Sequence, residues 1–342
     1  MQSHTVPRKL LDQFAFDDPV TGSRRMWRYE RGKSPRWDAS PRTATRIDGH
    51  LADPDNAAKE EILERRLARE FEEPVNQFLF RVGEPDFRAT DEQRRQLTFY
   101  VTLLFLRSDA RKRASGHTHE VMRHAINRFL ANDFQVFNVS AKWSIDLLLS
   151  GKMSVGLVTR EDVVNAARKY IVDADPTTEA RRSYVRLIEA AMESADEKLL
   201  TGRWDQLATT PENPFVISDA PVVTWQRNAE GLISQGVGFH RPDVEVFMPV
   251  SPTRCLHILP NVPRTRPVAR PSVDDINAAL ASMSTRYCYT NVNSPLVDRV
   301  VQEWAGNAEL GVKSFTVWHR NYDDSFYDLF MNDGKWIDPP RF

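Results

Sequence analysis

Residues 177–202 read TTEARRSYVRLIEAAMESADEKLLTG, and this stretch divides the chain into a helical part and a strand-rich part. Apolar residues recur in steps of three and four from Ala180 to Leu199, which is the spacing of one face of an amphipathic helix. After Gly202 the pattern changes to short β-branched or aromatic segments bounded by Pro, Asn and Gly, which is typical of strands. We expect these strands at 214–223, 245–250 and 254–259.

The residues before this stretch also predict helices. Helical spacing runs from Asp55 to Val82, and Pro74 should kink or divide that helix because proline has no N–H to donate. Thr90 is a good capping residue for a second helix, which carries the apolar run Leu97–Leu106. Further helices are expected at about 118–131, 135–150, 160–171, 273–285 and 295–306.

Together these patterns predict an α+β fold, in which a large central helical block is separate from a small, mainly antiparallel sheet built from N-terminal and C-terminal segments. We expect a β or extended segment at 1–55, the helical block at 56–202, a strand-rich region with two helices at 203–312, and an aromatic tail at 313–342. Strands and helices do not alternate, which argues against a doubly wound sheet.

The composition excludes several classes of protein. The 342 residues include 46 Lys and Arg against 47 Asp and Glu, so no overall charge selects a nucleic acid or an anionic membrane as partner. Hydrophobic residues make up 41%, as in globular proteins rather than disordered chains. Two cysteines, Cys255 and Cys288, are too few for a disulfide scaffold or a four-thiolate zinc site, and both are expected to be buried thiols.

The apolar runs are too short for a membrane protein. No apolar stretch of signal-peptide length follows Arg8 and Lys9. The run Leu97–Leu106 is shorter than the roughly 20 residues that span a bilayer. These features predict a cytoplasmic protein with no membrane partner.

Well-known catalytic motifs are absent. There is no GxxxxGK[ST] phosphate loop, no GxGxxG, no GxSxG and no CxxC. His119 and His124 are five residues apart, which places them about 140° apart around a helix, so they do not form a zincin pair. Glu70 and Glu73 lie among arginines and are expected on a solvated face. No metal ligands are assigned, although a divalent metal as cofactor stays open.

A basic patch follows the run Leu97–Leu106. Between residues 94 and 128, eight Arg and Lys residues stand against two acidic ones. This patch could hold the phosphates of RNA or DNA through charge alone. The alternative is that these cations complement a helix dipole and aid solubility.

Three segments carry a resemblance to a known family. HTVPRKLLDQFA begins at His4, FVISDAPVV contains Ser218 and Asp219, and PVSPTRCLHI begins at Pro249. In this order they resemble the landmarks of a mainly bacterial family catalogued as domain of unknown function 4238, over roughly residues 3–290. Ala220 stands where the resemblance implies an Asn in many relatives. The resemblance implies no particular reaction.

These landmark residues suggest a hydrolytic site. His4 could act as general acid or base, and Asp219 could orient its imidazole. Ser218 could bind substrate or act as a nucleophile. Arg107, with Arg111 and Arg8, would bind a phosphate. Alternatively, Asp219 forms an ordinary turn and His4 only anchors the chain end.

The predicted function is therefore a hydrolase, most plausibly a nuclease or phosphodiesterase of defence or toxin type, with catalytic residues His4, Asp219 and Ser218. The alternative is a non-enzymatic module that binds nucleic acid through the basic patch or a protein partner through the tail at 313–342. Both hypotheses depend on which polar side chains meet in one cavity.

Overall fold

The structure is a computed structural model that describes residues 2–56, 58–84, 86–113, 175–227, 233–235, 238–241, 243–261, 270–307, 331–332 and 335–336. The chain divides into two compact units, one of residues 1–112 and 184–310 and one of residues 113–183 and 311–342. The first is called the main unit below. In the second unit, β13 (Met331–Asn332) pairs with β14 (Lys335–Trp336).

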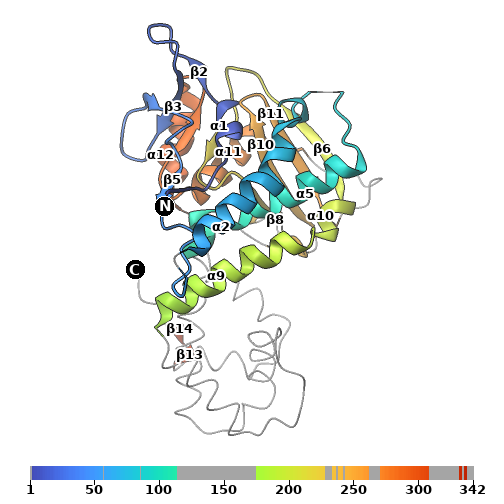
Figure 1. The fold of residues 1–342 in the computed structure, drawn as a ribbon. Helices are drawn as coiled ribbons and strands as arrows, with labels where there is room; N and C mark the ends of the chain where they lie inside the picture. The colour runs from blue at the N-terminus through green and yellow to red at the C-terminus, as the bar shows by residue number, and fades with distance from the viewer. Residues whose placement is uncertain are drawn as a thin grey trace, which may run out of the picture. The chain divides into compact units, whose positions relative to one another are not determined.

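The main unit contains two open five-stranded sheets and one short ladder, all with antiparallel pairs (Figure 1). The first sheet has the order β6 (Arg203–Ala208), β11 (Arg254–Leu259), β10 (Val244–Ser251), β8 (Val223–Arg227) and β9 (Ile233–Gln235). The second sheet has the order β2 (Phe16–Asp17), β3 (Arg24–Tyr29), β12 (Cys288–Thr290) and β7 (Ile217–Ser218), with β4 (Arg36–Ala39) also on β3. The ladder joins β1 (Gln2–His4) to β5 (Arg46–Asp48).

The described helices of the main unit come from two parts of the chain. Those of the first part are α1 (Arg8–Asp12), α2 (Lys59–Arg66), the π-helix η1 (Leu67–Glu72), α3 (Glu73–Asn76), α4 (Leu79–Val82) and α5 (Asp91–Leu106). Those of the later part are α9 (Pro176–Glu193), which begins in the second unit, α10 (Glu197–Thr201), α11 (Val273–Met283) and α12 (Pro295–Trp304). Among the described residues no helix is both long and apolar enough to span a membrane.

The α+β prediction is confirmed. The second sheet joins N-terminal strands to C-terminal ones, since Cys288 of β12 pairs with both Tyr29 of β3 and Ser218 of β7. The first sheet is built entirely from residues after Gly202: β10 and β11 match the strands expected at 245–250 and 254–259, whereas β6 and β9 were not predicted. Two sheets form rather than one because the segment 214–223 contributes the short strand β7 to one sheet and the start of β8 to the other.

Both faces of the first sheet are buried, as the alternating side chains of β10 show. Val246 and Met248 pack with α1 and α5 in one cluster, whereas Phe247 packs with α11 and α12 in another. This alternation is the two-residue period of a strand. Cys255 and Cys288 belong to the second cluster as free, buried thiols, as expected, and burial raises the pKa of each.

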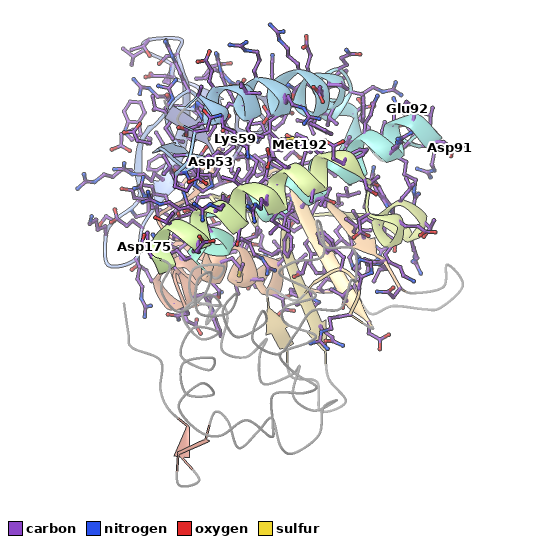
Figure 2. The ribbon with its side chains drawn as sticks, turned by 60° about the horizontal axis from the view of Figure 1, so that its bottom comes forward. Asp53, Lys59, Asp91, Glu92, Asp175 and Met192 are labelled. Carbon is purple, nitrogen blue, oxygen red and sulfur yellow. The ribbon has the colours of Figure 1, made fainter. Side chains whose placement is uncertain are left out.

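Helix α5 begins at the predicted cap. Thr90 and Gln93 form a capping box, in which the Thr90 hydroxyl accepts from the Gln93 N–H and the Gln93 side chain accepts from the Thr90 N–H. Asp91 and Glu92, at the end of α5 in Figure 2, place negative charge at the positive end of the helix dipole.

The expected helix from 55 to 82 continues through Pro74, where it changes from π to α geometry, and it is interrupted at residues 77–78, before α4. Pro74 lies in the first turn of α3, directly after the π-helix η1. The N–H of Glu73 donates to the carbonyl of Ala68, five residues earlier, which is the π-helical bond. The wider turn removes the need for the N–H that proline lacks.

Helix α9 ends earlier than expected. Asp196 caps a new helix, α10, since its side chain accepts a hydrogen bond from the Leu199 N–H at 3.0 Å. Lys59 bridges α9 to the preceding chain, with its ammonium 3.0 Å from carboxylate oxygens of both Asp53 and Glu189. Figure 2 shows Lys59 and Asp53 close together near α9. The helices expected at 118–131, 135–150 and 160–171, the histidines at 117–124 and most of the tail at 313–342 lie outside the described residues.

Candidate functional site

His4 lies at the end of β1, opposite Arg46 of β5. Its Nε2 accepts a hydrogen bond from Nε of Arg46 at 3.1 Å, so in the neutral ring the proton is on Nδ1, which is buried and has no partner among the described residues. Burial, followed by the charges of Arg46 and Arg107, lowers the pKa of His4. The ring is therefore neutral at neutral pH.

Arg107 follows α5 and lies beside His4. Its guanidinium donates to the carbonyl oxygen of His4 and forms ion pairs with Glu72 at 2.6 Å and Glu64 at 3.5 Å. The Arg107 side chain is only 2% exposed. Because two carboxylates already neutralise this buried cation, Arg107 fastens β1 to the helices and presents no charge to an external phosphate.

The backbone of Arg107 extends this polar cluster to α9. Nε2 of His50 lies 2.7 Å from the Arg107 carbonyl oxygen and 3.0 Å from the hydroxyl of Tyr184. Burial, followed by the charge of Lys112, lowers the pKa of His50 to about 4. These contacts join the loop after β5, the end of α5 and the main-unit part of α9.

Ser218 and Asp219 form a second polar cluster at the end of β7. The Ser218 hydroxyl donates to the carbonyl of Leu280 in α11 at 3.2 Å. The Asp219 carboxylate accepts from the backbone N–H of Thr285 at 3.1 Å and from the Thr285 hydroxyl. Burial raises the pKa of Asp219. Both side chains thus hold the turn after β7 against the end of α11.

The structure brings His4 and Arg107 together but does not bond them to Ser218 or Asp219. In the described part of the chain, no hydrogen bond or ion pair joins the two clusters. The catalytic combination of His4, Ser218 and Asp219 stays a prediction.

The other two predicted substrate-binding residues lie apart. Arg8 is exposed and forms an ion pair with Asp12 at 3.8 Å. Arg111 is half-buried, with its guanidinium 3.9 Å from the ring centroid of Phe105, and burial lowers its pKa to about 10. In the described part of the predicted basic patch, residues 94–113, Arg107 and Arg111 are turned into the protein; the rest of the patch lies outside the described residues. Among the described residues, no group of three or more His, Cys, Asp or Glu residues could hold a metal ion.

A cavity of about 530 Å³ lies instead at the outer edge of the first sheet, beside strand β6. Its lining combines cations with aromatic and apolar side chains: Arg88, Arg94, Arg203, Arg254, Arg270, Phe87, Trp204, Val82, Leu97 and Leu256, together with Ala89, Gln206 and a single acid, Asp205. An arginine-lined cavity with aromatic walls suits an anionic ligand that also has an apolar part.

Two arginines are fixed in place by the protein. The guanidinium of Arg94 donates to the carbonyl oxygens of Leu200 and Gly202 and lies 4.6 Å from the ring centroid of Trp204. Arg203 pairs with Asp205 at 2.7 Å. Arg94 is thus held in position against Trp204, and the charge of Arg203 is neutralised by Asp205.

Arg254 differs from these because its guanidinium has no hydrogen-bond or ion-pair partner in the part of the chain that the structure describes. It is half-buried at the start of β11. Gly83 makes room for its stem, since a Cβ at Gly83 would lie 3.3 Å from both Cβ and Cγ of Arg254. A half-buried charge with no protein partner is a strong indication of a binding site.

Sequence reasoning did not find this cavity, because its arginines come from segments far apart in the chain. One signal was present: Arg254 is part of the PVSPTRCLHI landmark. A second was the pairing of arginine with an aromatic residue at Phe87–Arg88 and Arg203–Trp204.

The fold and these two features define an α+β protein with a buried ionic cluster and an arginine-lined cavity. The chain belongs to the family described as protein of unknown function (DUF4238), which it matches over residues 2–294. The match includes every residue of the cavity and of both polar clusters. No curated protein and no solved structure matches the chain.

Proposed function

We propose that this protein is a binding module for a phosphate-bearing nucleic-acid ligand, which it holds in the arginine-lined cavity. The observation that carries the proposal is the convergence of five arginines and Trp204 on one cavity, with a single acid among the lining residues that the structure describes. Guanidinium groups bind phosphate through paired hydrogen bonds, and an aromatic wall suits a base. With a net charge of −1, the chain would attract such a ligand locally rather than through its overall field.

Fluorescence anisotropy with labelled single-stranded RNA and DNA tests this function. We expect binding that weakens with salt, and Arg254→Ala should reduce the affinity about tenfold and lower the salt dependence by about one ion. Arg95→Ala is the matched control, because Arg95 is exposed on the same helix as Arg94 and does not line the cavity. No binding, or equal losses in both variants, would refute the proposal.

A nuclease or phosphodiesterase is a second candidate, favoured by the neutral imidazole of His4 beside Arg107 and Glu72. On this proposal His4, Asp219 and Ser218 would act on RNA or DNA in a cytoplasmic defence or toxin role. It requires the two polar clusters to approach each other during turnover. Cleavage of labelled RNA or DNA, with and without a chelator, by the wild type but not by a folded His4→Ala variant would support it. Equal cleavage by both, or none, would eliminate it.

A partner protein bound by the tail at 313–342 remains a prediction from the sequence. That segment lies almost entirely outside the described residues.

A further inference from the structure

The positive charge around the cavity exceeds what is needed to neutralise one internal phosphodiester. Asp205, the acid among the described lining residues, neutralises Arg203. Arg254 and Arg270 have no hydrogen-bond or ion-pair partner among the described residues. An internal phosphodiester carries a single negative charge, whereas a phosphomonoester carries nearly two at neutral pH.

The size of the cavity limits the ligand to a short one. At about 530 Å³ it falls in the range of small-molecule sites, of roughly 300–1,000 Å³, and is too small for a long single strand to pass through. Several negative charges must therefore come from one nucleotide rather than from successive phosphates along a strand.

The apolar lining indicates that the ligand has more than a phosphate. Val82, Leu97 and Leu256 are buried members of the core cluster that reach the cavity, and Phe87 and Trp204 add aromatic surface. Most of this surface is already covered by the protein, but Trp204 is half-buried, so a nucleoside would cover aromatic surface that inorganic phosphate leaves exposed to water. Arginines and apolar side chains in one cavity thus match the two ends of a nucleotide.

From these observations we infer that the cavity binds a nucleotide through a terminal phosphomonoester, with Arg254 and Arg270 on the phosphate and the nucleoside against Phe87 and Trp204. This inference rests on the proposed nucleic-acid function and specifies its ligand. The nucleotide could be free or could form the phosphorylated end of a strand, since both present the same group.

Competition binding separates these sources. The probes are one labelled oligonucleotide with a 5′-phosphate, a 3′-phosphate or no terminal phosphate, together with free adenosine monophosphate and adenosine. We expect a preference of about tenfold for a phosphorylated end over the unphosphorylated strand, or for the monophosphate over adenosine, because the dianion makes additional charge-assisted hydrogen bonds. Binding of the monophosphate alone would identify a free nucleotide as the ligand.

The preference should also depend on pH in a predictable way. Because the second pKa of a phosphomonoester is about 6, the advantage of the phosphorylated end should shrink as the pH falls from 7.5 to 5.5. Affinity for the unphosphorylated strand should change less over that range, since its diesters stay singly charged. An advantage that stays constant would contradict the inference.

Two variants link the preference to the cavity. Arg254→Ala should abolish it, and Arg270→Ala should reduce it; because Arg270 is exposed, the second variant remains informative if the first unfolds. Equal binding of phosphorylated and unphosphorylated ends, with Arg254→Ala weakening both, would overturn this inference and leave the proposed function standing. Absence of any binding, or insensitivity to both variants, would overturn the two together.

Discussion

A carboxylate oxygen of Glu72 lies 2.6 Å from the guanidinium of Arg107, and both atoms are held by elements that the sequence leaves far apart. Glu72 is the last residue of the π-helix η1, and Arg107 directly follows α5. The same guanidinium donates to the carbonyl of His4, so one buried cation connects the N-terminal strand to two helical segments. This makes Arg107 a structural centre of the main unit.

Replacing Arg107 should therefore lower the free energy of unfolding. Arg107→Met leaves Glu72, which is mostly buried, without the guanidinium that neutralises it, and breaking a buried pair in this way costs about 3–5 kcal/mol. Urea denaturation followed by circular dichroism measures the loss.

Two further variants isolate the cause of that loss. Adding Glu72→Gln to Arg107→Met should recover part of the stability, because it removes the charge that Arg107 no longer neutralises. Arg95→Met, an exposed change on the same helix, should alter the free energy of unfolding by less than about 0.5 kcal/mol. A loss below about 1 kcal/mol for Arg107→Met would contradict the role given to this residue.

His50 should make the stability depend on pH. Its pKa is about 4 in the folded protein and about 6.5 when unfolded, so between these values the unfolded chain binds a proton that the folded protein does not. Stability should fall as the pH is lowered from 6.5 to 4, by about 3 kcal/mol from this residue.

The comparison with His50→Gln isolates this effect from the other titrating groups. The variant keeps an N–H that can donate to the Arg107 carbonyl but cannot titrate, so the stability gap between wild type and variant should narrow on acidification. The exposed His240→Gln is the control for loss of an imidazole. Parallel stability curves for wild type and His50→Gln between pH 7 and 4 would show that the effect is absent.

Asp219 is expected to act on stability through its hydrogen bonds to Thr285. Asp219→Ala leaves the half-buried N–H and hydroxyl donors of Thr285 without their acceptor, which costs about 1–3 kcal/mol. Asp219→Asn should cost less, because the amide oxygen still accepts and because burial, which raises the pKa of Asp219, disfavours its charged form at neutral pH. Thermal unfolding of both variants, with the exposed Asp48→Asn as control, measures the difference. An unchanged melting temperature in both variants would contradict a structural role for Asp219.

The architecture could be predicted where one local signal dominates. Thr90 and Gln93 specify the start of α5, and Pro74 marks the point where the helix changes from π to α geometry. The division into two sheets could not be predicted, because it depends on whether Ile217 pairs with Tyr289, a contact between residues far apart in the chain. Local patterns contain no information about such pairings.

The candidate site was harder to predict for a related reason. The sequence identifies Arg107 and Arg111 as charges but not that the chain turns them inward, since burial depends on the acids and aromatic rings that surround them in space. The cation that lacks a partner among the described residues, Arg254, looks like an ordinary strand residue until Gly83 is placed beside it and the cavity in front of it.

Gly83→Ala should weaken ligand binding without touching a charge. Gly83 has ordinary helical backbone angles, so alanine fits its backbone, but the new Cβ would lie 3.3 Å from the stem of Arg254 and push it from its position. If Arg254 contacts the phosphate, we expect a several-fold loss of affinity for a phosphorylated oligonucleotide, with the free energy of unfolding changed by less than about 1 kcal/mol. Gly238→Ala is the matched control, because nothing lies within 4 Å of its Cβ position. Since Gly83→Ala keeps all five arginines, unchanged affinity would mean that the total positive charge, and not the placement of Arg254, determines binding.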